Sequence, residues 1–126
     1  MTGFCVVLTT TDSEAHAERI VDAVLGANLA ACLQLMPIKS CYVWAGKIAR
    51  DNEILIQIKA KTADFDDLAT CIRAAHTYEV PEIVRLDIAG RAIISRLDYR
   101  GDPVKASPPP QGDLPPLRWL FGHAHV

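Results

Sequence analysis

Side chains that bind soft metals are spread along the chain rather than paired. The four cysteines, Cys5, Cys32, Cys41 and Cys71, form no CxxC pair, which argues against a zinc ribbon or a thioredoxin-type redox site. Cys32, Cys71 and His76 could bind copper or zinc together if the fold brings their segments side by side, because these metals take thiolate and imidazole ligands. Alternatively, the thiols are small buried hydrophobes and the imidazole has a structural role.

A second cluster surrounds a proline near position 81. Tyr78, Glu79 and Glu82 lie there, and two carboxylates at this spacing resemble an acid/base pair. The sequence offers no activated nucleophile and no glycine-rich phosphate-binding loop beside them. A small hydrolase is therefore the least favoured function, and the chain is predicted not to be an enzyme. The carboxylates are expected to form ion pairs between subunits, with Lys47, Lys59 or Arg85.

Two aromatic residues, Tyr42 and Trp44, belong to a stretch that is predicted to form a hairpin. They could stack on a ligand, but aromatic residues on such an element are more often interface anchors. Together with the proline cluster they define the expected interface or pocket. Its members are Tyr42, Trp44, Lys47, Lys59, Tyr78, Glu79 and Glu82.

A strand and a helix open the chain. Residues 4–10 are rich in β-branched side chains and lack polar interruption, which predicts a strand buried on both faces. Thr11 and Glu14 have the spacing of a capping box, so a helix is expected to begin there. An apolar stripe at helical spacing follows, and Gly26 is placed to end the helix.

A long hairpin comes next. Residues 29–44 predict a strand that Pro37 breaks or bulges, because proline cannot donate to a strand ladder. Ala45 and Gly46 form the turn. Apolar and polar residues then alternate up to Lys61, which is the pattern of a half-buried strand.

A helix capped by Thr62 or Asp64 and ending near His76, followed by a strand over residues 82–88, completes the order β-α-β-β-α-β. This order predicts an α+β, ferredoxin-like sandwich in which an antiparallel sheet carries both helices on one face. The other face would expose apolar side chains such as Leu55. Exposed apolar area of that size marks an association surface, so a homo-oligomer is expected.

Composition limits the partners. The chain has 126 residues, a net charge of −2 and a pI near 6.0, so neither nucleic acid nor an anionic membrane surface is expected to bind. The absence of a long apolar run and of a basic leader predicts a cytoplasmic protein rather than a membrane protein.

One domain is expected over residues 1–100, closed by a short helix over residues 92–99. Residues 101–126 form a proline-rich tail. Within this tail, Leu117–Phe121 is apolar enough to dock back on the domain or on a neighbour, and His123 and His125 could bind metal adventitiously.

Four patches in a fixed order resemble the CutA family of divalent-cation tolerance proteins, over roughly residues 4–90. They are Leu29-Ala-Ala-Cys32, Tyr42-Val-Trp-Ala-Gly-Lys47, Glu53 with Ile58-Lys59, and His76-Thr-Tyr-Glu-Val-Pro-Glu-Ile83, where Thr77 replaces the usual proline. The resemblance implies a ferredoxin-like subunit in a tight trimer, with hairpins continuing the neighbours' sheets. It also implies a role in tolerance to copper and other divalent metals and no established reaction.

The copper ligands proposed for some relatives carry over only in part. The resemblance places them at Thr9, Ala75 and His76, and the first two cannot ligate a soft metal. The function expected from the sequence is metal-ion homeostasis by a homotrimer, with copper or another divalent metal at inter-subunit sites. The alternative is a PII-like signalling protein that binds a small anionic ligand in the clefts between subunits and contacts an unidentified protein partner.

Overall fold

The computed structural model describes residues 2–90, and the short helix expected over residues 92–99 and the tail from residue 101 lie outside this range. The division into a domain and a tail therefore stays a prediction. The described elements are β1 (Phe4–Thr11), α1 (Glu14–Gly26), β2 (Cys32–Trp44), β3 (Lys47–Lys61), a 3-10 turn (Thr62–Asp64), α2 (Phe65–Ala75) and β4 (Val84–Asp87).

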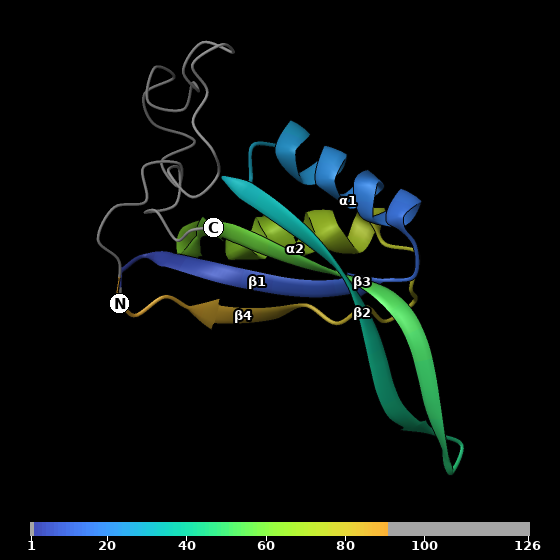
Figure 1. Ribbon diagram of the computed structural model, residues 1–126. Helices are drawn as coiled ribbons and strands as arrows, with labels where there is room; N and C mark the ends of the chain where they lie inside the picture. The colour runs from blue at the N-terminus through green and yellow to red at the C-terminus, as the bar shows by residue number, and fades with distance from the viewer. Residues whose placement is uncertain (1, 91–126) are drawn as a thin grey trace, which may run out of the picture.

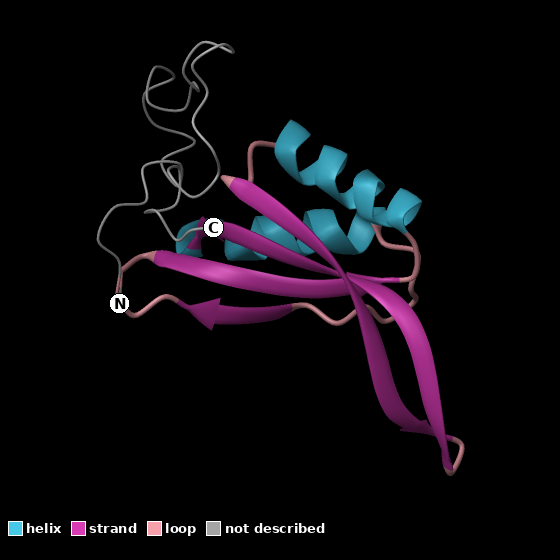
Figure 2. Ribbon diagram, viewed as in Figure 1, coloured by secondary structure: helices cyan, strands magenta, loops and turns pink. Residues whose placement is uncertain are grey.

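The strands form one sheet in the order β2-β3-β1-β4, and each neighbouring pair is antiparallel. Both helices lie against the same face of this sheet (Figures 1 and 2). The other face has no helix over it among the described residues. The predicted α+β, ferredoxin-like arrangement is thus confirmed.

The core lies between the sheet and the two helices. Ile20 and Val24 of α1 and Leu68 and Ile72 of α2 are fully buried there. The sheet contributes alternate residues from β1 and β3, namely Cys5, Val7, Ile56, Ile58 and Ala60. The residues between them, such as Val6 and Leu8 on β1, are only half-buried. The prediction that β1 is buried on both faces was therefore wrong, because the second face is open.

Pro37 does not interrupt β2, contrary to the sequence expectation. The ladder with β3 continues without a bulge from Cys32 to Trp44, and Pro37 pairs with Ile54. Proline is tolerated because β2 is an edge strand with one neighbour, so the missing N–H can face away from β3.

Helix α1 ends at Gly26, as predicted, but it begins at a different position from the predicted one. Ser13, not Thr11, is the N-cap, and its hydroxyl accepts the His16 N–H at 3.1 Å. Thr11 remains in β1. At the other end Gly26 is the last helical residue, and Asn28 takes the left-handed conformation with φ 58°. The Leu29 N–H then bonds the Val24 carbonyl, as in a Schellman motif.

The hairpin extends beyond the body of the sheet. β1 pairs with β3 only between Ile54 and Lys61, so within the described part of the chain residues 38–53 have no strand beside them except each other. We call residues 38–53 the hairpin arm; Figure 1 shows it projecting from the sheet. Its tip turns through Ala45 (φ 52°) and Gly46 (φ 76°), and two successive positive φ angles define a type I′ turn.

Candidate functional site

A groove of about 620 Å³ lies where the hairpin arm meets the sheet. It combines aromatic rings with carboxylates, which come from the arm and from the loop that leads into β4. Its lining residues are Thr10, Tyr42, Trp44, Asp51, Glu53, Tyr78, Val80 and Glu82. We call this the acidic groove.

Strand pairing places two of the carboxylates on one side of the arm. Asp51 and Glu53 are two residues apart on β3, so their side chains point to the same face. The Tyr42 hydroxyl donates to Asp51 across the hairpin, and the Tyr78 hydroxyl donates to Glu53 at 2.6 Å. Burial, followed by this hydrogen bond, raises the pKa of the Tyr78 phenol above its ordinary value of 10.0. Tyr78 therefore stays a donor to Glu53 at neutral pH.

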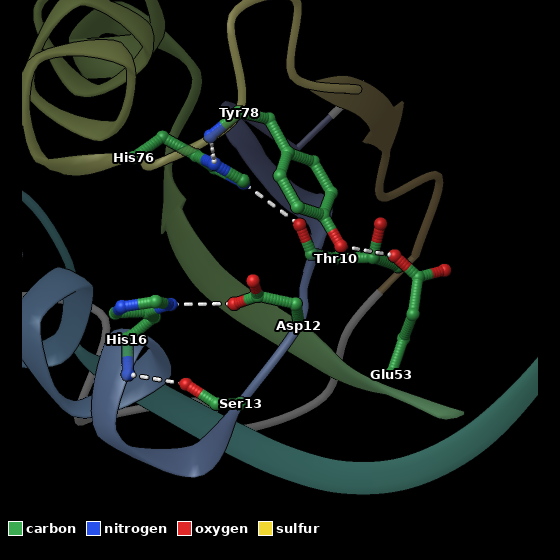
Figure 3. Close-up of polar contacts among 7 residues, drawn as sticks. All are labelled: Thr10, Asp12, Ser13, His16, Glu53, His76 and Tyr78. Carbon is green, nitrogen blue, oxygen red and sulfur yellow. Dashed lines mark hydrogen bonds and ion pairs between the residues drawn. The ribbon is translucent and has the colours of Figure 1, made fainter. Parts of the chain in front are cut away.

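His76 fixes the position of Tyr78. Its Nε2 donates to the Thr10 carbonyl at 2.7 Å, and its Nδ1 accepts the Tyr78 backbone N–H at 3.0 Å (Figure 3). A carbonyl can only accept and a backbone N–H can only donate, so these partners specify the neutral tautomer with its proton on Nε2. The two rings also lie against each other, with centroids 4.7 Å apart.

A second polar pair lies beside this one at the start of α1. The His16 Nδ1 contacts the Asp12 carboxylate at 2.5 Å, and this hydrogen bond lowers the pKa of Asp12 (Figure 3). Asp12, His16 and Asp51 were not predicted as site residues from the sequence. The spacing of four residues between Asp12 and His16 across a helix start was the one available signal for the first pair.

The acidic groove carries negative charge that the described residues do not neutralise. Two ion pairs within residues 2–90 join His16 to Asp12 and Arg85 to Asp87, and neither pair includes Asp51, Glu53 or Glu82. Among the described residues, no lysine or arginine lines the groove. A smaller depression of about 360 Å³ at the arm's base does contain Lys39, together with Asp12 and Glu53.

The three predicted metal ligands are not brought together within one chain. Cys32 pairs with Lys59, which alternates with the buried Ile58 and Ala60, so Cys32 lies on the open face of the sheet. Cys71 packs against the core on the helix side. Residues 2–90 contain no group of three histidine, cysteine or acidic side chains arranged to hold a metal ion. His76 has both ring nitrogens engaged. A thiolate–imidazole site therefore does not fit a single chain.

The position where relatives are thought to carry a copper-binding cysteine is also unsuited to metal. Thr9 is fully buried on the helix side of β1. Its hydroxyl and that of Thr11 have no hydrogen-bond partner among the described residues. Ala75 ends α2 and offers no donor atom.

The seven expected interface or pocket residues divide into two sets. Tyr42, Trp44, Tyr78 and Glu82 all line the acidic groove. The others do not: Lys47 lies at the exposed tip of the arm, Lys59 on the open face of the sheet, and Glu79 in the exposed loop after α2. Over residues 2–90, no helix is both long and apolar enough to cross a membrane.

Residues 5–93 match the family model of CutA1, described as a divalent ion tolerance protein. The divalent-cation tolerance protein CutA of Thermus thermophilus is 42% identical over 85 residues, which cover 67% of this chain and 82% of that protein. A chloroplastic CutA 1 protein of Oryza sativa is 36% identical over 68% of this chain and 49% of its own length. A solved structure, the periplasmic divalent cation tolerance protein CutA of Archaeoglobus fulgidus, superposes with a TM-score of 0.70 at 32% identity, covering 76% of this chain and 93% of its own.

Proposed function

The chain belongs to the CutA1 family of divalent ion tolerance proteins, and on that basis we propose that it serves metal-ion homeostasis as a homotrimer that binds divalent cations weakly at its subunit interfaces. The family resemblance supplies the trimer and the cation class. The geometry of the acidic groove supplies the candidate ligands.

The hairpin arm supports assembly. Val43 and Trp44 are each 72% exposed and Ile48 is 63% exposed. Val43 pairs with Ile48 on one face of the arm, and Trp44 and Tyr42 lie on the other. A two-stranded ribbon is marginally stable alone, and its apolar residues gain roughly 25 cal/mol per Å² when removed from water. Contact with neighbouring subunits through the face that carries Val43 and Ile48 would stabilise the arm.

One observation carries the choice of ligands: the histidine of the site is fully hydrogen-bonded, whereas carboxylates line the groove beside it. A metal on His76 would have to displace the Thr10 carbonyl or the Tyr78 N–H. Asp51, Glu53 and Glu82 offer oxygen donors instead, which suit hard divalent cations. Because one chain holds no complete set of ligands within residues 2–90, we propose that a second subunit completes the site.

Calorimetry with manganese tests this assignment. The full chain should carry His123→Asn and His125→Asn, which remove the two terminal imidazoles. Replacing Glu53 and Glu82 together by glutamine should abolish the binding heat, because each substitution removes a negative ligand. Glu79→Gln is the matched control, since Glu79 is exposed in the same loop but does not line the groove. Undiminished binding by the double variant would overturn the assignment.

Copper binding should be weaker than in relatives with a cysteine at position 9. The same titration with copper, repeated after a combined Cys32→Ser, Cys71→Ser and His76→Ala replacement, tests the ligands expected from the sequence. We propose no dependence on the two thiols within one subunit, because they lie on opposite faces of the sheet.

The PII-like alternative predicts an anionic ligand. The acidic groove disfavours one, while Lys39 in the smaller depression is the observation that keeps this alternative open. A thermal-shift screen of nucleotides against divalent metals separates the two functions. A non-enzymatic role and a cytoplasmic location also remain proposals; relatives are described as periplasmic in one case and chloroplastic in another.

A further inference from the structure

The acidic groove matches the chemistry of a short segment of the same chain. We propose that Leu117–Phe121 docks into the groove in the metal-free protein, with the Arg118 guanidinium on Glu82. This occupant is distinct from the divalent cation proposed above, and its test is made without metal, so the two proposals can fail separately.

Glu82 is the groove carboxylate most available to a new cation. Asp51 and Glu53 each already accept a tyrosine hydroxyl. Glu82 is exposed, and it makes no ion pair or hydrogen bond within residues 2–90. A carboxylate of this kind gains most from a bidentate guanidinium, which supplies two parallel charge-assisted hydrogen bonds.

The segment carries complementary groups. Its sequence, Leu-Arg-Trp-Leu-Phe, sets one permanent positive charge among four apolar side chains. The groove sets its carboxylates among Tyr42, Trp44 and Tyr78. Trp44 is 72% exposed, so an apolar or cationic partner would both cover it and stack on it. The match is therefore one of charge and of apolar surface together.

The connection between β4 and Leu117–Phe121 is long enough for this segment to reach the acidic groove. β4 leads away from the base of the hairpin arm toward the N-terminal end of β1 (Figure 1). From Glu82 at the groove to Gly90, the last described residue, the backbone covers at most about 27 Å. The residues between Gly90 and Leu117 could span up to about 90 Å if extended. The length of this connection therefore allows the segment to dock on its own subunit. Because the segment is covalently linked to the groove, its effective concentration there is higher than that of a free peptide.

Fluorescence of the full chain tests the proposal. The protein has two tryptophans, Trp44 and Trp119, so Trp44→Phe leaves Trp119 as the single reporter while keeping an aromatic ring in the groove. With metal removed by chelation, acrylamide should quench Trp119 far less than it quenches N-acetyltryptophanamide. Adding Arg118→Glu should lower the ratio of docked to free segment at least about tenfold, because an attractive pair becomes a repulsive one.

Two further variants make the result specific. Arg100→Glu changes the charge equally outside the segment and should leave Trp119 shielded. Adding Glu82→Arg to Arg118→Glu reverses the pair and should restore the shielding. An exposed Trp119 in the parent protein would overturn the proposal, as would shielding that survives Arg118→Glu. Loss of shielding that Glu82→Arg fails to restore would overturn the groove as the docking site.

Discussion

At the scale of single residues, a chain of hydrogen bonds holds the loop after α2 on the sheet. His76 joins the Thr10 carbonyl of β1 to the Tyr78 N–H, and Tyr78 joins Glu53 of β3. Two of these contacts use backbone groups, which cannot change between donor and acceptor. The loop that carries Val80 and Glu82 into the acidic groove is positioned by this network.

Removing the Tyr78 hydroxyl should destabilise the protein. Tyr78→Phe leaves the half-buried Glu53 carboxylate without its donor, and we expect a loss of about 1 kcal/mol in the free energy of unfolding, measured with urea at pH 7. Tyr42→Phe is the control, because it deletes an equivalent hydrogen bond from an exposed part of the arm. Equal losses from both variants would contradict the central position given to Tyr78.

The advantage of wild type over Tyr78→Phe should shrink at alkaline pH. The folded-state pKa of Tyr78 is raised above 10.0, so above pH 10 the unfolded chain releases a proton that the folded chain retains. Stability linked to this group is therefore complete below pH 10 and is lost as the pH rises toward the folded pKa. Urea unfolding of both proteins between pH 8 and about 11 measures the difference. A stability difference between wild type and Tyr78→Phe that grows as the pH rises would contradict this prediction.

At the scale of elements, left-handed residues determine where the hairpin turns and where α1 ends. Ala45 has φ 52° in the type I′ turn, a conformation that is costly for alanine and favourable for asparagine. Ala45→Asn should stabilise the protein by about 0.5–1 kcal/mol in thermal unfolding. Gly46→Ala, at φ 76°, should cost a similar amount. A loss of stability from Ala45→Asn together with a gain from Gly46→Ala would show that the turn is of another type.

The end of α1 offers a parallel test. Asn28 occupies the left-handed position, and Gly26 is helical. Asn28→Gly should be neutral or slightly stabilising, whereas Asn28→Ala should cost about 1 kcal/mol in urea unfolding, since alanine tolerates this conformation poorly. Gly26→Ala should be tolerated, because a Cβ there would meet no atom within 4 Å. A large loss of stability from Gly26→Ala would contradict this expectation and show that the helix end requires glycine at this position.

Periodicity was sufficient to predict the element order, and that order predicted the open face of the sheet. The uninterrupted apolar run of β1 wrongly indicated burial on both faces. Periodicity located the end of α1 at Gly26 and the end of α2 near His76, but it could not locate the start of α1. Thr11 and Ser13 both carry a hydroxyl that could cap the start of α1. Which of them is the N-cap depends on where β1 ends. Periodicity also could not show that β2 is an edge strand, which is why Pro37 was expected to break it.

For the site, aromatic and acidic residue types near a proline predicted four lining residues of the acidic groove. Asp51 was not predicted, because its contact with Tyr42 depends on the register of the β2–β3 hairpin. Cys32 and Cys71 were grouped on the condition that the fold brings their segments side by side. Strand alternation places Cys32 on the open face of the sheet, whereas Cys71 of α2 packs on the helix side. Whether such a metal site can form depends on the direction of the side chains as well as on the proximity of their segments.

At the scale of the whole molecule, the exposed arm should control assembly. Replacing Val43 and Ile48 together by lysine should raise the dissociation constant of the oligomer more than about tenfold, because each buried apolar side chain contributes about 1.5–3 kcal/mol. Leu25→Lys is the control, since Leu25 is 48% exposed on α1, away from the arm. Sedimentation at several concentrations measures this, and an unchanged oligomer would exclude the arm from the interface.

Native mass spectrometry of the full chain, with His123 and His125 replaced by asparagine, tests metal binding and assembly together. We predict a trimer that takes up about one manganese ion per subunit at millimolar metal, and a Glu53→Gln, Glu82→Gln trimer that takes up none, because the ligands are the groove carboxylates. A monomer, or a trimer whose metal uptake is unchanged by the two substitutions, would contradict the account.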